Sequence, residues 1–405
     1  MLEYTAGGGY VDAAIPSSVL SEGYGMLRTL ISDLKAAGHE VTTFLDFRLA
    51  RFDPPIRANV IQISVPEQLE EALIAFSRSV DAVYVIAPES DGTLGRLVEI
   101  VKRSGGLSLN CSAGAIARAS DKSKMYEALG QSRLPIPQYV TIKPGRIKQK
   151  INDAMAQLGL PAIFKPVHAA GCGGLSLVTS RAEVPLAVDK ARTHTSNSSF
   201  IVQKFVTGTA ASVSVISTGE GAMPLSLNRQ LLRLASPKSE SSYLGGIVPL
   251  HHPMEQEALS IGRLAVESIE GLRGYVGVDM VLSSHGPVII EVNPRVTTSY
   301  IGISSVLNLN LAQALVESVV QRKLPRRPRT SGYAIFSKLV APAFPRENLG
   351  RTYDMAEVIS PPFPTDEGRE YALIGTKSVS PTHSRRLLSK ARRRFVKTVL
   401  ESSTW

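Results

Sequence analysis

The sequence is poor in cysteine and tryptophan, with only two cysteines (Cys111 and Cys172) and one tryptophan in 405 residues. Two thiols are too few for the cross-linked framework of a small secreted domain, which excludes a disulfide scaffold. Runs of about 18 apolar residues are also lacking, so we expect no membrane span. The first residues show no basic segment followed by an apolar one. We therefore expect no secretory signal and a cytoplasmic location.

Charged residues are also few: they make up 20% of the chain, and apolar residues make up 43%. Disordered chains have the opposite balance, so this composition predicts a folded protein with a large core. At about 150 residues per domain, the length predicts two to three domains.

The net charge of +10 is concentrated in two short segments. Residues 321–330 carry five basic side chains, and residues 381–405 carry seven basic and one acidic side chain. The rest of the chain is nearly neutral, which argues against nucleic acid as the main partner. The basic tail is either a solvated helix or a surface for nucleic acid, anionic lipid or an acidic protein.

The order of the predicted elements divides the chain. Residues 1–118 alternate helices and apolar strands, which predicts a parallel α/β sheet. Residues 119–320 contain antiparallel hairpins between helices, typical of an α+β unit. Pro325 and Pro328 then introduce a C-terminal extension, 321–405, which has an apolar strand at 331–342 and ends in the basic helix. The predicted fold class is thus α/β followed by α+β.

A glycine-rich loop follows Lys165 and contains Gly171, Gly173 and Gly174. Small residues let backbone N–H groups turn toward an anion, and a lysine at the end of the preceding strand can reach a phosphate. The loop lacks the G-K-[ST] sequence and leads into a strand, so it is not a P-loop. It is either a phosphate cover or a flexible hairpin.

A predicted hairpin pairs strands 277–282 and 288–293 through a five-residue turn. If the turn is centred on His285, Asp279 faces Glu291, and Asn293 lies on the same face as Glu291. Facing carboxylates repel unless a cation lies between them, and these oxygen ligands suit Mg²⁺, with Mn²⁺ as an alternative. The other interpretation is two strand-end acids in water.

Taken together, these segments resemble the ATP-grasp superfamily of carboxylate–amine ligases over about residues 121–307. The similarity lies in Ser120-Asp121-Lys122, Ile163-Phe164-Lys165-Pro166, the segment 200–208, Gly277-Val278-Asp279 and Ile290-Glu291-Val292-Asn293-Pro294-Arg295, which follow the order of the family. The implied fold has a pre-ATP-grasp domain (1–118) and an ATP-binding unit (119–320), with a lid at about 119–206 and a metal-binding part at about 207–320.

The resemblance also implies the roles of individual residues. Lys122 and Lys165 would hold the phosphates of ATP beneath the glycine loop, and Arg295 would stabilise charge on the transferring phosphoryl group. The hinge that reads adenine through its backbone would be Gln203, Lys204, Phe205 and Val206. The family often has acids in the hinge and a glutamate near position 210 for the ribose, where this chain has Gln203, Lys204 and Ala210. The Mg²⁺ ligands would be Asp279, Glu291 and Asn293.

Three further segments narrow the resemblance: residues 3–9, residues 18–26 and residues 293–300. They resemble the tyramine–L-glutamate ligases of methanofuran biosynthesis, or their relatives in bacterial one-carbon metabolism. The implied reaction joins the side-chain carboxylate of glutamate to tyramine through an acyl phosphate. Residues placed to contact the substrate are Arg229, Tyr243, Thr297 and Ser299, although Arg229 could equally lie on the surface.

Two alternatives stay open at this point. One is an ATP-grasp ligase for another amino acid, amine or pterin. The other is a non-catalytic nucleotide-binding protein whose basic tail meets nucleic acid. The oligomeric state is not encoded in any pattern that we can read, and a dimer is one option.

Overall fold

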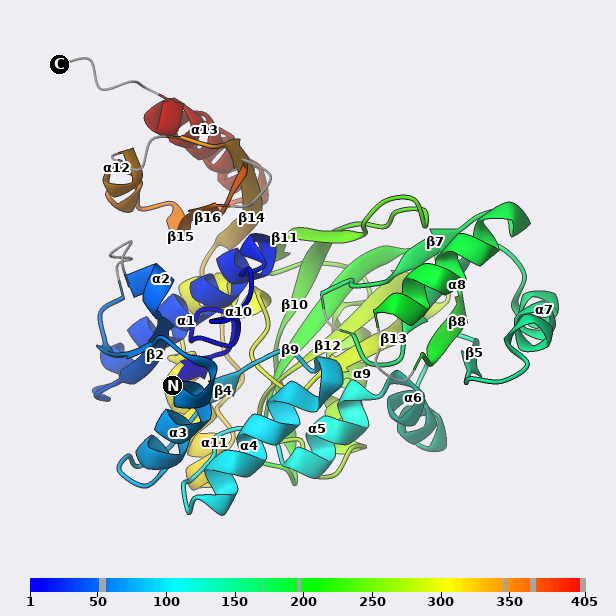
Figure 1. The fold of residues 1–405 in the computed structure, drawn as a ribbon, viewed down its shortest axis with the longest axis horizontal. Coiled ribbons are helices and arrows are strands. Elements are labelled where there is room, and N and C mark those ends of the chain that lie inside the picture. The colour runs from blue at the N-terminus through cyan, green and yellow to red at the C-terminus, as the bar shows by residue number, and fades with distance from the viewer. Residues whose placement is uncertain (51–55, 170, 195–197, 345–347, 365–368, 401–405) are drawn as a thin grey trace.

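The computed structural model describes residues 1–50, 56–169, 171–194, 198–344, 348–364 and 369–400. A long antiparallel sheet runs through the molecule (Figure 1). The N-terminal α/β unit covers part of the sheet, a smaller unit with its own sheet lies at one end, and the C-terminal elements lie at the other end.

The N-terminal unit is built on parallel strand pairs, as the alternation of its elements predicts. Strands β1 and β4 form one parallel pair and β2 and β3 form another, and Val83 bridges Ser108 in parallel. Its elements are β1 (Leu2–Glu3), α1 (Ser17–Ala36), β2 (Thr42–Asp46), α2 (Phe47–Ala50), β3 (Asn59–Ile63), α3 (Pro66–Ser77), β4 (Val85–Ile86), a 3₁₀ turn (Ser90–Gly92), α4 (Thr93–Arg103) and α5 (Ala113–Ser120).

The small unit holds a four-stranded sheet in the order β5-β8-β6-β7, with antiparallel neighbours. Asp121 is the N-cap of the first helix of this unit. Its carboxylate accepts hydrogen bonds from the backbone N–H groups of Ser123 and Lys124. The elements are α6 (Lys122–Gln131), β5 (Tyr139–Ile142), α7 (Ile147–Leu158), β6 (Ala162–Pro166), β7 (Ser176–Val178), a 3₁₀ turn (Arg181–Glu183), α8 (Val184–Thr193) and β8 (Phe200–Lys204).

The large sheet has eight strands in the order β13-β12-β9-β10-β11-β14-β16-β15. Helix α9 packs on one face of β9 and β10, while α1 and α10 pack on the opposite side. The elements before residue 321 are β9 (Thr209–Ser217), β10 (Ala222–Arg233), β11 (Ser242–Val248), α9 (Glu255–Glu267), β12 (Gly274–Ser283), β13 (Gly286–Asn293), α10 (Ser299–Val306) and α11 (Leu311–Val320).

The turn between β12 and β13 differs from the prediction. Ser283 pairs with Gly286, so the loop contains two residues rather than five and is not centred on His285. Gly286 allows this tight loop because it adopts a positive φ of 116°. A β-bulge between Asp279 and Met280 then shifts the register by one residue. Asp279 faces Glu291 because of the bulge, not because of the turn.

The C-terminal segment continues the large sheet. Strand β14 pairs with β11 and β16, and β15 pairs with β16. The segment contains β14 (Tyr333–Pro342), α12 (Leu349–Tyr353), β15 (Val358–Pro364), β16 (Arg369–Ser378) and α13 (Pro381–Leu400). The domain boundaries at 118 and 320 stay predictions, but strands β14, β15 and β16 are integral to the large sheet rather than a separate extension.

The basic tail is a helix with one apolar side. Leu388, Phe395 and Val399 of α13 are buried with residues of β14 and β16, while the basic side chains are exposed. Both interpretations of the tail require these exposed basic side chains, and the choice between them stays a prediction. Among the described residues, none of the helices has the length and apolar character needed to span a bilayer.

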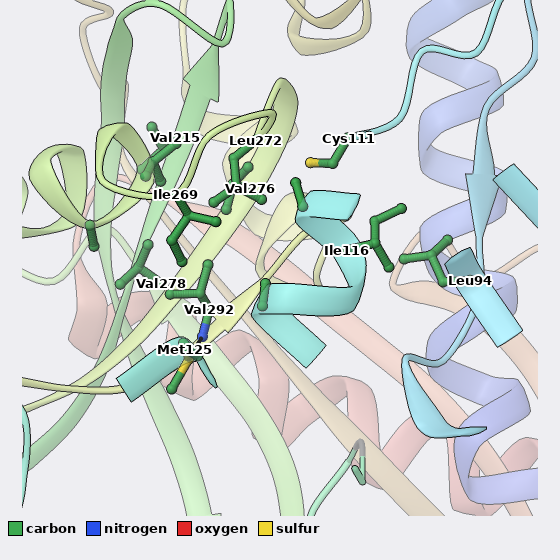
Figure 2. Close-up of a cluster of buried hydrophobic side chains, with 14 of the residues drawn as sticks. Leu94, Cys111, Ile116, Met125, Val215, Ile269, Leu272, Val276, Val278 and Val292 are labelled. Atoms are coloured by element: carbon green, nitrogen blue, oxygen red, sulfur yellow. Dashed lines mark hydrogen bonds between the residues drawn. The ribbon is translucent and has the colours of Figure 1, made fainter. Parts of the chain in front are cut away.

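The main core crosses from the N-terminal unit into the large sheet. Figure 2 shows Ile116 of α5 beside Leu94 of α4, with Val278 of β12 and Val292 of β13 on the other side. Met125 of α6 joins this group, because its sulfur accepts the backbone N–H of Val292. The two units therefore share one apolar core and fix the position of the β12–β13 hairpin between them.

We expect Phe395→Ala to lower the free energy of unfolding by about 3–5 kcal/mol, because it removes a fully buried ring from the contact between α13 and the sheet. Denaturant titration measures the change. The matched control is Arg393→Ala on the exposed side of α13, for which we expect a change within about 0.5 kcal/mol. Equal effects of the two substitutions would contradict an integral role for this helix.

Candidate active site

The structure brings the three predicted metal ligands together at the open end of the β12–β13 hairpin. Asp279 pairs directly with Glu291, and the Asn293 amide nitrogen lies 3.1 Å from Oδ2 of Asp279. The Gln230 side chain on β10 reaches the same carboxylate and donates a hydrogen bond of 2.8 Å to Oδ1. Asp279 is thus held by two amides while it faces a second carboxylate.

This arrangement separates the acidities of the two carboxyl groups. Burial, and then the charge of Glu291, raise the pKa of Asp279 to about 7. Burial alone also favours a higher pKa for Glu291, but the nearby Lys122 and Lys165 charges outweigh it and leave that pKa below its ordinary value. Nζ of Lys122 lies 2.8 Å from Oε1 of Glu291, which supplies most of the compensation.

Lys165 lies on β6 of the small sheet, where 3% of the residue is exposed. Its ammonium donates a hydrogen bond of 3.0 Å to the hydroxyl of Tyr126. That hydroxyl lies 2.9 Å from both Oε1 of Gln203 and the carbonyl oxygen of Ile290, and donates to one of them. Burial and the Lys122 charge lower the pKa of Lys165 to about 7.

The donor set suits a hard divalent cation. Asp279 and Glu291 offer carboxylate oxygens, Asn293 offers an amide oxygen, and the mutual repulsion of the carboxylates favours a cation between them. Among the residues that the structure describes, no three His, Cys, Asp or Glu side chains gather as a closed metal site. Phosphate oxygens and water would have to complete the coordination, as is usual for Mg²⁺.

Arg295 lies near the carboxylates but already has a partner. Its guanidinium forms a paired contact with Glu89 of the N-terminal unit, at 2.8 Å from Nε to Oε1 and 3.0 Å from the second nitrogen to Oε2. The two side chains are only 15% and 8% exposed. A role of Arg295 on a transferring phosphoryl group stays a prediction, and it requires the guanidinium to keep or exchange this contact.

The predicted phosphate loop adopts conformations that need small residues. Gly171 and Gly174 have φ values of 64° and 68°, and a Cβ at Gly174 would clash with Pro166 and His194. Cys172 shares the left-handed conformation with a φ of 70°. The carbonyl of Ala169 accepts a hydrogen bond of 2.7 Å from Lys122, which ties the loop to the lysine that contacts Glu291.

In the predicted hinge, two of the backbone N–H groups that would contact adenine are already hydrogen-bonded within the protein. The N–H of Lys204 donates to Gln138 O, and the N–H of Phe205 donates to Pro161 O. An adenine contact through either N–H group therefore requires the present bond to break. The Gln203 side chain points to Tyr126 rather than into an open hinge. The nucleotide roles of Gln203, Lys204, Phe205 and Val206 stay predictions.

Three predicted substrate contacts lie on the same face of the sheet as the carboxylates. The hydroxyl of Tyr243 bonds with Ser299, and its pKa is well above the usual value because of burial and then the charges of Glu22 and Asp279. Oγ of Ser299 is 3.4 Å from Oγ of Ser212, which is paired with Asp279. Thr297 packs against Gly277, where a Cβ would come within 2.5 Å of the threonine methyl group.

Arg229 lies on the surface, which is one of the two positions expected from the sequence, and its substrate contact stays a prediction. It neighbours Gln230 on β10, and side chains alternate between the faces of a strand. Gln230 binds Asp279, so Arg229 points to the opposite, exposed face.

Gln230, Tyr126 and Glu89 take part in the site although no sequence motif pointed to them. The alternation of Ser226 and Asn228 with Leu225 and Leu227 could have revealed β10 and its polar face, which Gln230 continues. The partnerships of Tyr126 and Glu89 connect residues far apart in sequence and leave no local signal.

Comparison with known families agrees with this geometry. Residues 119–299 match the ATP-grasp domain, and residues 39–116 match the pre-ATP-grasp 3 domain. The chain carries both domains of an ATP-grasp ligase.

The ligase is similar to tyramine–L-glutamate ligases of two archaea. It is 29% identical to the Methanocaldococcus fervens protein over 329 residues, which cover 80% of this chain and 94% of that one. It is 26% identical to the Methanocaldococcus jannaschii protein over 335 residues, which cover 82% and 92%. A solved ATP-grasp superfamily protein from Archaeoglobus fulgidus shares the fold, with a TM-score of 0.63, 23% identity, and coverage of 93% of this chain and 98% of that one.

Proteins of this superfamily bind ATP and small-molecule substrates. The resemblance inferred from the sequence and the fold class are confirmed. The alternative of a non-catalytic nucleotide-binding protein is not supported, because the relatives are enzymes.

We expect Lys165→Ala to raise the KM for ATP by about ten- to a hundredfold, since it removes a buried charged hydrogen-bond donor. The ammonium is protonated below its pKa of about 7 and neutral above it. ATP affinity of the unmodified ligase should therefore fall above pH 7, by at most about tenfold per pH unit, and this slope should be absent in the variant. Steady-state kinetics from pH 6 to 9 measure both effects, with the exposed Lys148→Ala as control. An identical slope in the two proteins would exclude Lys165 as its source.

Proposed function

We propose that the ligase joins the side-chain carboxylate of glutamate to the amine of tyramine, with ATP and Mg²⁺, and forms an amide, ADP and phosphate. The facing pair of Asp279 and Glu291 beneath Lys122 and Lys165 is the observation that carries the nucleotide and metal part of this proposal. The identity of the substrates rests on the similarity to tyramine–L-glutamate ligases. Methanofuran biosynthesis and a cytoplasmic location, where ATP is available, belong to the same proposal.

The reaction has two steps. A carboxylate oxygen attacks the γ-phosphorus of ATP, the bond from that phosphorus to the β–γ bridging oxygen breaks, and ADP leaves with the electron pair. The neutral amine nitrogen then attacks the acyl carbon of the acyl phosphate. The nitrogen loses a proton, the bond from carbon to the phosphate oxygen breaks, and phosphate leaves.

The chain contributes positions and charges rather than a covalent group. Lys122 and Lys165 neutralise phosphate oxygens, and the ordered Tyr126 hydroxyl fixes the direction of Lys165. Asp279, Glu291 and Asn293 would hold Mg²⁺, which would offset the negative charge of the phosphates of ATP. Arg295, whose guanidinium contacts Glu89, would offset charge on the transferring group.

Another acid or amine is the main alternative, because D-alanine–D-alanine ligases also resemble part of this chain. We expect ADP release to need both an acid and an amine, and the pair of L-glutamate and tyramine to give the highest rate among amino acids paired with amines. A coupled ADP assay with mass detection of the amide tests the proposal. Absence of the glutamyl amide would reject these substrates, while another amide in the same screen would keep the ligase class.

Glu291→Gln should lower turnover and raise the Mg²⁺ concentration needed for half-maximal rate, because it replaces a charged ligand and frees Lys122. The Asp279 pKa should fall as well, since the like charge opposite is removed. Titration of activity with Mg²⁺ and Mn²⁺ gives the first result. The exposed Glu220→Gln serves as the control. An unchanged Mg²⁺ requirement in Glu291→Gln would exclude this residue as a metal ligand.

A further inference from the structure

A second charged cluster lies between helix α1 and strand β14, outside the groups used so far. Glu22 of α1 and Lys338 of β14 form an ion pair whose side chains are 18% and 11% exposed. Thr298 donates a hydrogen bond of 2.6 Å to Oε2 of Glu22, and Lys338 donates one of 2.9 Å to Oγ of Ser18. Two opposite charges are thus held at one place by short polar side chains.

This cluster faces the same side of the large sheet as the carboxylates. Gln230, which binds Asp279, is paired with Gly246, and Gly246 is paired with Phe336. Paired residues share a face, and residues two apart on a strand share it as well, so Lys338 lies on the face that carries Gln230. The ion pair and Asp279 therefore lie on the same face of the large sheet.

The charges of the ion pair and of the carboxylates both act on Tyr243 and Cys172. Glu22 and Asp279 each act on the hydroxyl of Tyr243, after burial, to raise its pKa. Burial raises the pKa of the Cys172 thiol in the glycine loop to about 12. The charges of Glu291, Glu22 and Asp279 raise it further, and the Lys338 charge acts in the opposite direction. The glycine loop and Tyr243 thus lie within electrostatic reach of the metal candidates and of the ion pair.

We infer that Glu22 and Lys338 bind the α-ammonium and the α-carboxylate of an amino-acid substrate. The inference rests on the proposed function and deepens it. A ligand with one charge would break the ion pair between Glu22 and Lys338. One of these partially buried side chains would then lack a counter-ion, which raises the free energy of the complex. The α-ammonium and α-carboxylate of an amino acid are attached to one carbon, so such a ligand can pair with Glu22 and Lys338 at the same time. The single ion pair between the two side chains is then replaced by two ion pairs with the ligand.

This binding mode orients the amino acid and determines which of its carboxylates reacts. With the α-groups at Glu22 and Lys338, the side chain is the part of the amino acid that can extend toward Asp279 and Glu291. The activated group is then a side-chain carboxylate, so the substrate class is acidic amino acids. Neutral amino acids would bind at the ion pair without presenting an oxygen to ATP.

Two analogues of glutamate separate the two contacts. Glutarate lacks the α-ammonium, and 4-aminobutanoate lacks the α-carboxylate, while both retain the reacting carboxylate. We expect Glu22→Gln to lower kcat/KM for glutamate by about ten- to a hundredfold and to raise the value for glutarate, which no longer leaves Glu22 without a counter-ion. Lys338→Met should lower the value for glutamate by a similar factor and raise the value for 4-aminobutanoate, with the KM for ATP constant in both variants.

The control is Glu220→Gln, in the ion pair of Glu220 with Arg322, whose side chains are 75% and 72% exposed. It should leave all three acids unaffected. If Glu22→Gln and Lys338→Met instead lower the rates with all three acids equally, together with the melting temperature, the pair is only a structural contact and the inference is wrong.

Calorimetric titration of glutamate into the full chain, loaded with a non-hydrolysable ATP analogue and Mg²⁺, separates this inference from the proposed function. Binding by the unmodified ligase that is lost in both variants, without amide formation from tyramine, supports the inference and rejects tyramine as the amine. Binding that persists in both variants rejects the inference even if the amide forms. Failure of the unmodified ligase to bind glutamate rejects both.

Discussion

The architecture of the site depends on one repulsive contact, the pairing of Asp279 with Glu291 on adjacent strands. Like charges opposite each other destabilise a sheet, so the surroundings must compensate for them. Gln230 and Asn293 solvate Asp279, while Lys122 balances Glu291. Burial and then the charge of Glu291 still raise the pKa of Asp279, and a cation between the two carboxylates would offset both effects.

The Tyr126 hydroxyl connects this contact to the small sheet. It receives the Lys165 hydrogen bond from β6 and lies within hydrogen-bond distance of Gln203 on β8 and of the Ile290 carbonyl on β13. One side chain thus links the strand that carries the phosphate lysine to the hairpin that carries the carboxylates. Because it is fully buried, its partners cannot be replaced by water without cost, and the two sheets keep a defined relation.

The site is assembled from all three parts of the chain. The N-terminal unit supplies Glu89, which holds Arg295, and Glu22, which meets Lys338 from the C-terminal strand β14. The large sheet makes this possible, since its C-terminal strands extend the same face that carries Asp279. Residues that follow position 320 therefore belong to the candidate substrate site, and the protein cannot be understood as an ATP-binding unit with an appended tail.

The sequence by itself determined the order of the elements, the parallel character of the first unit and the residues of the carboxylate pair. These features depend on local periodicity and on short motifs such as Ile290-Glu291-Val292-Asn293, which a single strand encodes. The tertiary structure alone decided that a β-bulge, not the turn, brings Asp279 opposite Glu291, and that Gln230 rather than Arg229 faces the site. It alone decided the partners of Lys165, Arg295 and Glu22 as well. Such contacts join residues from separate elements, and their energies depend on burial and distance, which no local pattern of side chains specifies.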